Sequence, residues 1–137
     1  MRMESKEKII RNKDTGSAIE RYIKSFFHAI DGIIYTTIYE HNMIIMILAM
    51  ILVIVCGFVF RISSGEWLFC IAMIGLVMSF EMINTAIEAL VDLASPEIHP
   101  LAKIAKDTAS SASLIMSIVS FIGALIIFVP KVAIMLS

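Results

Sequence analysis

Three carboxylates lie on one stretch of sequence that is otherwise apolar enough to enter a membrane. On a helix that turns about 100° per residue, Glu81, Glu88 and Asp92 fall within roughly 40° of one another, with Asn84 beside them. A charge deep in a bilayer costs about 2.5 to 3.5 kcal/mol on insertion scales, so Glu81 is expected to face protein or a polar cavity. The acidic face of this helix is therefore the first place to look for chemistry.

The spacing of these carboxylates indicates separate roles. Glu81 and Glu88 are about 10 Å apart along a helix axis, too far to share one metal ion. Carboxylates at the carboxyl end of a helix oppose its dipole, so Glu88 calls for a bound cation. Hard oxygen ligands favour Mg²⁺, and Glu40, expected at a similar depth, is the second candidate ligand. Glu81 suits a general base for a lipid head group, because desolvation raises the proton affinity of a carboxylate.

A phosphate site, if there is one, must be built from these charges. None of the six glycines is arranged as a phosphate-binding loop. If ATP binds, a carboxylate-held metal and Lys106 must hold its phosphates. Simpler interpretations remain open: Glu40 and Glu88 as interfacial charges at helix ends, Asn84 as a hydrogen bond between helices, Lys106 as a marker of the cytoplasmic side. Asp107 could merely cap the following span.

Composition predicts the fold class. Of 137 residues, 59% are hydrophobic and 17% charged, which is too apolar for a soluble globule of this length. Residues 41–61, 67–94 and 108–130 are each expected to cross a hydrocarbon core of about 30 Å as a helix. We therefore expect an all-α membrane protein with no strands. The net charge of -1 speaks against nucleic acid as a partner.

The region before the first span divides into a tail and a helix. Residues 1–15 are charged and lack periodicity, so a mobile cytoplasmic tail is expected, followed by one domain over 16–137. Ser17 and Glu20 have the spacing of a capping box. Apolar residues then recur every three or four positions over 17–34, typical of an amphipathic helix in the membrane interface; docking on a soluble partner is the alternative. Gly32 predicts a bend into the first span.

Basic residues predict the orientation. Seven lysines and arginines precede the first span and Arg61 alone occupies the first loop. The chain is therefore expected in the plasma membrane, with its N-terminus on the cytoplasmic side. The stretch 92–107, interrupted by Pro96, is expected to form the main cytoplasmic loop, and the tail with Lys131 to lie outside. Cys56 and Cys70 are expected to be small buried apolar groups, and residues 109–113, all small, a packing surface.

A longer motif resembles a known family. Glu81-x-x-Asn84-Thr85-Ala86-Ile87-Glu88-x-x-x-Asp92, followed by Leu101-Ala102-Lys103-x-Ala105-Lys106-Asp107, resembles the signature of the prokaryotic diacylglycerol kinase family, which includes the undecaprenol kinases of Gram-positive bacteria. The resemblance extends over nearly the whole chain from about residue 19. It implies a homotrimer whose active sites are shared between subunits at the cytoplasmic interface, with ATP as co-substrate and a membrane lipid alcohol as acceptor.

The resemblance also implies residue roles. Glu81 resembles the catalytic base of the family, and Glu40 and Glu88 resemble its metal ligands. The residues that it assigns to the nucleotide and phosphate site are Arg21, Asn84, Lys106 and Asp107, with Asp92 in support. This sequence departs from the pattern where Gram-positive relatives tend to carry basic groups, since it has Asp31, Ile38 and His41 there.

The predicted activity is ATP- and magnesium-dependent phosphorylation of undecaprenol. The segments 99–103 and 128–131 favour the undecaprenol branch of the family. Diacylglycerol is the alternative acceptor within the same chemistry. From a different functional class, the chain could be a small non-enzymatic bundle or channel subunit whose acidic face conducts ions.

Overall fold

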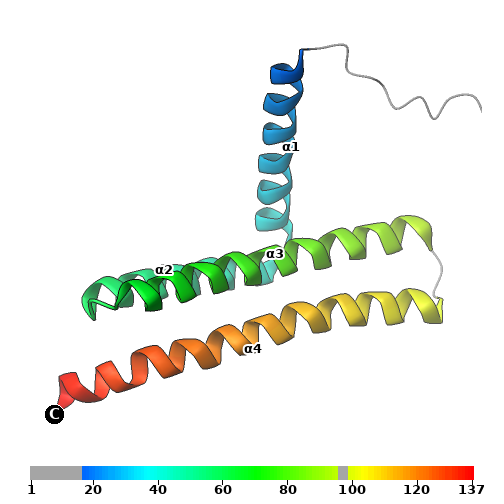
Figure 1. Cartoon of the computed structure of the whole chain (residues 1–137). Coiled ribbons are helices and arrows are strands. Elements are labelled where there is room, and N and C mark those ends of the chain that lie inside the picture. Colours follow the sequence, from blue (N-terminus) through cyan, green and yellow to red (C-terminus); the bar gives the residue numbers. More distant parts are fainter. Residues whose placement is uncertain (1–16, 96–98) are drawn as a thin grey trace, which may run out of the picture. The chain divides into compact units, whose positions relative to one another are not determined.

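The described part of the chain is built from four helices. The computed structural model describes residues 17–95 and 99–137, and within these ranges it contains helices and no strand. The helices are α1 (Ala18–Tyr39), α2 (His41–Val59), α3 (Ser64–Ala94) and α4 (Pro100–Leu136) (Figure 1). The all-α prediction is thereby confirmed for these ranges. The mobile tail predicted over 1–15 lies outside the described residues.

Helix α1 is longer than the sequence predicted. The Ser17 hydroxyl oxygen accepts a hydrogen bond from the Glu20 amide at 3.3 Å, which is one half of the predicted capping box. The helix continues through Gly32 and ends at Tyr39, so the break before the first span comes after the glycine and not at it. A glycine costs a helix interior only about 1 kcal/mol, which is too little to break a helix with isoleucines on both sides. The chain leaves the helical conformation at Glu40.

The chain divides into two compact units, and the second holds the three long apolar helices. The first unit ends at Ile34 and the second comprises Tyr35–Ser137. Within the second, α3 packs along α4 and against α2, and the three helices run side by side (Figure 1). Each of the three is long and apolar enough to cross a membrane.

Most of the apolar surface of these helices faces outward. Leu48, Leu68 and Ile126 are examples of large apolar side chains with most of their surface exposed. Water would not tolerate apolar patches of this extent, whereas hydrocarbon is their natural surroundings. The chain is accordingly an integral membrane protein.

Helix α3 begins before the predicted residue 67. The Ser63 hydroxyl oxygen accepts a hydrogen bond from the Glu66 amide at 3.4 Å, and the Ser63 amide donates to Glu66 Oε2 at 2.7 Å. This complete capping box lets the helix start at Ser64. The predicted span starts later because the serines and the glycine of this segment resemble turn residues as much as a helix start.

Helix α4 is longer than its predicted range of 108–130 at both ends. His99 caps it, with Nδ1 accepting a hydrogen bond from the Leu101 amide at 3.2 Å, and Pro100 occupies the first turn. Asp107 therefore lies inside the helix, so the interpretation of Asp107 as a cap is wrong and the predicted loop 92–107 is shorter than expected. At the other end the helix continues through Pro130 to Leu136, and the proline leaves one backbone carbonyl of the preceding turn without its helical hydrogen bond.

Two glycines allow aromatic rings of α3 to pack closely, Gly57 against α2 and Gly123 against α4. A Cβ atom added to Gly57 would lie 2.6 Å from the Trp67 ring, and Phe69 occupies the space beside Gly123. Trp67 also packs against Phe58, with ring centroids 5.0 Å apart. Small residues at these positions thus let neighbouring helices approach.

An ion pair links the ends of α3 and α4 near the same turn. Lys131 Nζ lies 2.9 Å from Glu66 Oε1, and both side chains are largely buried. Lys131, predicted to lie in an outer tail, therefore belongs to α4. Both cysteines are free: Cys70 is buried, as predicted, and Cys56 is half-buried.

Candidate active site

One buried carboxylate joins the three long helices. Glu81, on α3, is only 2% exposed. Its Oε1 accepts a hydrogen bond from Asn42 Nδ2 of α2 at 2.9 Å, and its Oε2 accepts one from the Ser113 hydroxyl of α4. Burying a polar side chain without hydrogen-bond partners costs free energy, and both oxygens of this carboxylate have a partner. Glu81 thus faces protein on every side.

The next turn of α3 carries a polar side chain with an unused hydrogen-bond acceptor. Thr85 donates its hydroxyl proton to the Glu81 backbone carbonyl at 3.1 Å, an internal helix contact. Asn84 is buried and its Nδ2 donates to Glu88 Oε1 at 3.3 Å. The other amide atom, Asn84 Oδ1, is buried and accepts no hydrogen bond within the described part of the chain. An acceptor left this way costs free energy unless a ligand fills it.

Glu88 and Asn84 present the oxygen chemistry that Mg²⁺ prefers. The half-buried Glu88 carboxylate and the vacant Asn84 Oδ1 are hard oxygen donors side by side. No group of three or more His, Cys, Asp or Glu side chains suited to a metal gathers within residues 17–95 and 99–137. Mg²⁺ usually needs only one or two carboxylates, completed by waters and substrate phosphates. The residues present therefore fit a magnesium ion that arrives with a nucleotide.

Glu40, the other predicted ligand, lies at the start of α2. It is the N-cap residue, with φ -102° and ψ 114°, yet its side chain makes no capping hydrogen bond. Its carboxylate is half-buried and sits two residues before Asn42, the donor to Glu81. A negative charge at a helix N-terminus is favoured by the helix dipole. Glu40 is thus an acidic group on the chain segment that leads to the buried carboxylate.

Lys106 lies on α4 opposite the acidic face of α3. Its Nζ bonds both carboxylate oxygens of Asp92, at 2.8 and 3.1 Å, and Glu88 is also within its electrostatic reach. Asp92 is largely exposed, so this pair is accessible to a competing anion. Asp107, the next residue, is exposed, and its backbone carbonyl accepts a hydrogen bond from Ser111 at 2.7 Å. Of the predicted phosphate ligands, Lys106 and Asn84 are therefore both engaged with acidic side chains of α3, Lys106 with Asp92 and Asn84 with Glu88.

Arg21 belongs to a different part of the chain. It is exposed on α1, in the unit that ends at Ile34. The site described above is built from the other unit alone. The phosphate-binding role of Arg21 stays a prediction from the resemblance.

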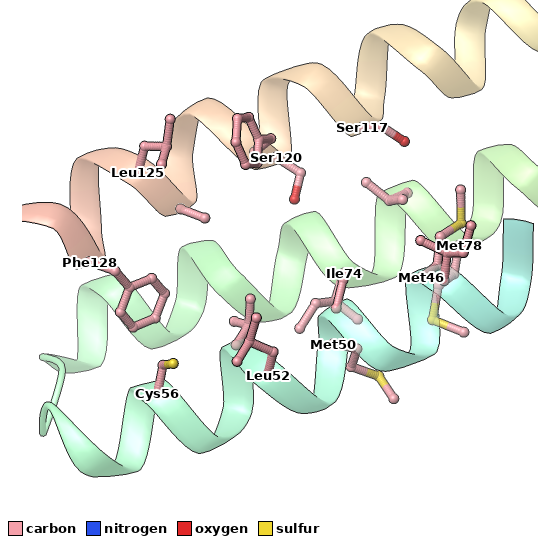
Figure 2. A pocket seen from close by; sticks show the side chains of 16 residues that line it. Met46, Met50, Leu52, Cys56, Ile74, Met78, Ser117, Ser120, Leu125 and Phe128 are labelled. Carbon is pink, nitrogen blue, oxygen red and sulfur yellow. The ribbon is translucent and has the colours of Figure 1, made fainter.

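An apolar groove lies next to Glu81 along the three helices. It has a volume of about 500 Å³ and is lined almost entirely by apolar side chains, with Ser117 and Ser120 on α4 as the hydroxyl groups (Figure 2). On each helix, a lining residue lies one helical turn from Glu81 or from one of its two hydrogen-bond donors. Met46 follows Asn42, Met78 precedes Glu81 and Ser117 follows Ser113. The carboxylate therefore sits where a polar cluster gives way to an apolar groove.

Two residues of this site were missed by reasoning from sequence. Ser113 was assigned to a packing surface, and Ala109 and Ser113 are indeed buried, but the serine also donates to Glu81. Asn42, at the start of the first predicted span, was given no role. Both residues are hydrogen-bond donors at the edge of, or within, an apolar helix, and such donors are candidates to contact a buried carboxylate on another helix.

Comparison with known proteins agrees with the motif. A model of the family described as prokaryotic diacylglycerol kinase matches residues 27–128. The undecaprenol kinase of Bacillus subtilis strain 168 is 42% identical over 120 residues, which cover 88% of this chain and 98% of that protein. A diacylglycerol kinase of Helicobacter pylori is 37% identical over 97 residues, covering 70% of this chain and 75% of that protein. A diacylglycerol kinase of Pseudomonas aeruginosa is 40% identical over 70 residues, covering 51% and 57%.

These matches confirm the resemblance inferred from the motif of residues 81–92. They span the apolar helices and the polar cluster, and they come with names that all denote lipid kinases. The non-enzymatic bundle considered from sequence is thereby set aside. The chain belongs to the prokaryotic diacylglycerol kinase family and is a membrane lipid kinase.

Proposed function

We propose that this protein transfers the γ-phosphoryl group of ATP to the hydroxyl of undecaprenol, with Mg²⁺, at the cytoplasmic face of the plasma membrane. The observation that carries the proposal is the position of Glu81. Its carboxylate is buried between three helices, with the apolar groove on one side and the Asn84, Glu88 and Lys106 cluster on the other. A reaction between a lipid hydroxyl and a nucleotide needs such a junction.

The groove accounts for how the acceptor is held. A polyprenyl chain lies along the groove between α2 and α4, and its terminal hydroxyl reaches the Glu81 carboxylate. Met46, Met50 and Met78 line this path (Figure 2). Methionine side chains are flexible and polarizable, so they adapt to an irregular hydrocarbon chain. Holding the hydroxyl in place converts the encounter with ATP into an effectively intramolecular step.

The chemistry follows from the charges. Glu81 takes the proton of the lipid hydroxyl as its oxygen attacks the γ-phosphorus, and the β–γ bridging oxygen leaves with ADP. Lys106 exchanges Asp92 for phosphate oxygens and so opposes their charge. When Mg²⁺ is bound by Glu88 and Glu40, with Asn84 Oδ1 in support, it supplies charge neutralisation of the phosphates. Arg21 and Asp107 complete the nucleotide site by resemblance.

Undecaprenol is favoured over diacylglycerol by two observations. The undecaprenol kinase of Bacillus subtilis aligns over 98% of its own length. The groove also has few polar groups beside Ser117 and Ser120, whereas the ester carbonyls next to the hydroxyl of diacylglycerol need hydrogen-bond donors. Diacylglycerol stays the second candidate, since the Helicobacter pylori and Pseudomonas aeruginosa relatives carry that name.

The proposal includes an assembly and an orientation. By resemblance the protein forms a homotrimer with sites shared between subunits. The amphipathic helix α1 lies in the membrane interface, the N-terminus is cytoplasmic and the C-terminus is outside, as the distribution of basic residues indicates. This orientation brings Lys106 and Glu88 to the side where ATP is available.

An acceptor panel tests the proposal. The purified protein is incubated with γ-labelled ATP, Mg²⁺ and, in separate reactions, undecaprenol, diacylglycerol or ceramide in mixed micelles, and the extracted lipid is counted. Label is expected in undecaprenol at the highest kcat/KM. Preferential labelling of diacylglycerol would identify diacylglycerol, and not undecaprenol, as the acceptor. The absence of labelled lipid in every reaction would overturn the proposed activity. Ion flux through proteoliposomes without ATP would instead support the channel hypothesis.

A further inference from the structure

Both oxygens of the buried carboxylate are held from different helices. Asn42 Nδ2 of α2 lies 2.9 Å from Glu81 Oε1, and the Ser113 hydroxyl of α4 donates to Glu81 Oε2. Glu81 itself is on α3, so one side chain from each neighbouring helix fixes its position. Neither donor belongs to the motif of residues 81–92 or to the segment 101–107 that carry the family resemblance.

The two donors differ in what they can do. The amide nitrogen of Asn42 can only donate a hydrogen bond, so it favours negative charge on Oε1 throughout. The Ser113 hydroxyl can donate or accept, because it carries one proton and two lone pairs. Ser113 therefore suits Oε2 both as a carboxylate oxygen and as the oxygen that carries a proton.

We propose that Asn42 and Ser113 are positioning residues for Glu81: Asn42 fixes Oε1 as the unprotonated oxygen, and Ser113 holds Oε2 as the oxygen that receives the substrate proton. This inference rests on the proposed function and assigns the two Glu81 oxygens different roles within it. The lipid oxygen loses its proton to Oε2 and forms a bond to the γ-phosphorus, while the β–γ bridge bond breaks and its electron pair leaves on ADP. After transfer, Ser113 turns from donor to acceptor.

A purely structural role of Ser113 would require only a small side chain, not a hydroxyl. Ser113 is 5% exposed, next to the buried turn of Ala109. Helix packing at such a position needs only a small side chain, and alanine would serve as well as serine. A hydroxyl is required only if the contact with the Glu81 carboxylate matters. The two roles therefore predict opposite results for Ser113→Ala.

The test compares Ser113→Ala, Ser113→Thr and Asn42→Ala with wild type in the labelled-ATP assay. Losing one hydrogen bond to a charged group is expected to lower kcat roughly 10-fold to 100-fold. The KM values for ATP and lipid should stay within about two-fold, because neither residue touches the bound substrates. Ser113→Thr keeps the hydroxyl and should recover most of kcat. Asn42 is exposed, so Asn42→Ala carries the test even if changes at the buried position 113 prevent folding.

Ser79→Ala is the matched control, since Ser79 is exposed on α3 two residues before Glu81 and thus on the other side of the helix. It should retain wild-type kcat. The inference is overturned if Ser113→Ala or Asn42→Ala, folded by thermal melting in detergent, keeps kcat within about two-fold of wild type. It is also overturned if the variants change only KM. Inactive wild-type protein would instead count against the proposed function, so the two failures are distinguishable.

Discussion

At the scale of single residues, the proposed proton acceptor and the proposed cation ligand lie in different surroundings. Glu81 is enclosed by α2, α3 and α4. Glu88 is half-buried and accepts a hydrogen bond of 3.3 Å from Asn84. The two glutamates, seven positions apart on one helix, therefore experience different surroundings suited to different roles.

Replacing Glu88 tests the cation role. Glu88→Gln keeps the size of the side chain and removes its charge, so Mg²⁺ should bind more weakly. We expect the Mg²⁺ concentration for half-maximal activity to rise about 10-fold, with activity recovering at high Mg²⁺. A Mg²⁺ titration of label transfer measures this change. An unchanged titration for Glu88→Gln would contradict the assignment.

Replacing Asp92 tests whether Lys106 is a phosphate ligand. The nucleotide must compete with Asp92, whose bonds to Lys106 Nζ are 2.8 and 3.1 Å long. Exposed ion pairs contribute only about 0.2 to 1 kcal/mol, so Asp92→Asn should lower the KM for ATP by a factor of about 1.5 to 5. Lys106→Met should raise that KM. If the two variants shift KM in the same direction, Lys106 does not exchange Asp92 for phosphate.

At the scale of elements, the sequence predicted the three apolar helices but misjudged their ends. Length and hydropathy are averages over about 20 residues and so locate a span well. Helix starts depend on one or two side chains: Ser63 and Glu66 begin α3, and His99 and Pro100 begin α4. The stretch 100–107 is polar enough to resemble a loop, although it forms the first two turns of α4. Lys106 is consequently held on a helix rather than in a loop.

The site was only partly predictable for a related reason. The carboxylates of α3 were found because a charge in an apolar helix is expensive wherever it points. Asn42 and Ser113 belong to other helices, and their contact with Glu81 depends on how the helices are placed side by side. Helical periodicity describes one helix at a time and carries no information on the register between helices. The pairing of these donors with Glu81 therefore required the structure.

The glycines beside aromatic rings give a stability prediction for the elements. Gly57→Ala would place a methyl group against Trp67, where the added Cβ lies 2.6 Å from the ring, and should destabilise the fold by about 1 to 3 kcal/mol. Gly123→Ala should act similarly against Phe69. Gly75→Ala is the control, because nothing lies within 4 Å of its added Cβ. It should be neutral or stabilising by up to about 1 kcal/mol. Thermal unfolding in detergent measures all three, and equal melting temperatures would refute the packing account.

At the scale of the whole molecule, three membrane helices create a boundary between two solvents. In the proposed function, the groove between α2 and α4 holds the hydrocarbon chain of the lipid, and the cluster at Glu88 and Lys106 binds phosphate and cation. Glu81 lies between this groove and this cluster, so the proposed mechanism depends on its role.

Label transfer by wild-type protein and Glu81→Gln tests that role most directly. Glutamine has nearly the same shape, can still accept from Asn42 and can donate to Ser113, so the fold should persist, which thermal melting in detergent checks. With γ-labelled ATP, Mg²⁺ and undecaprenol, the wild type should label the lipid and Glu81→Gln should be slower by about 100-fold or more, as expected for loss of a general base. Wild-type rates from folded Glu81→Gln would contradict the mechanism.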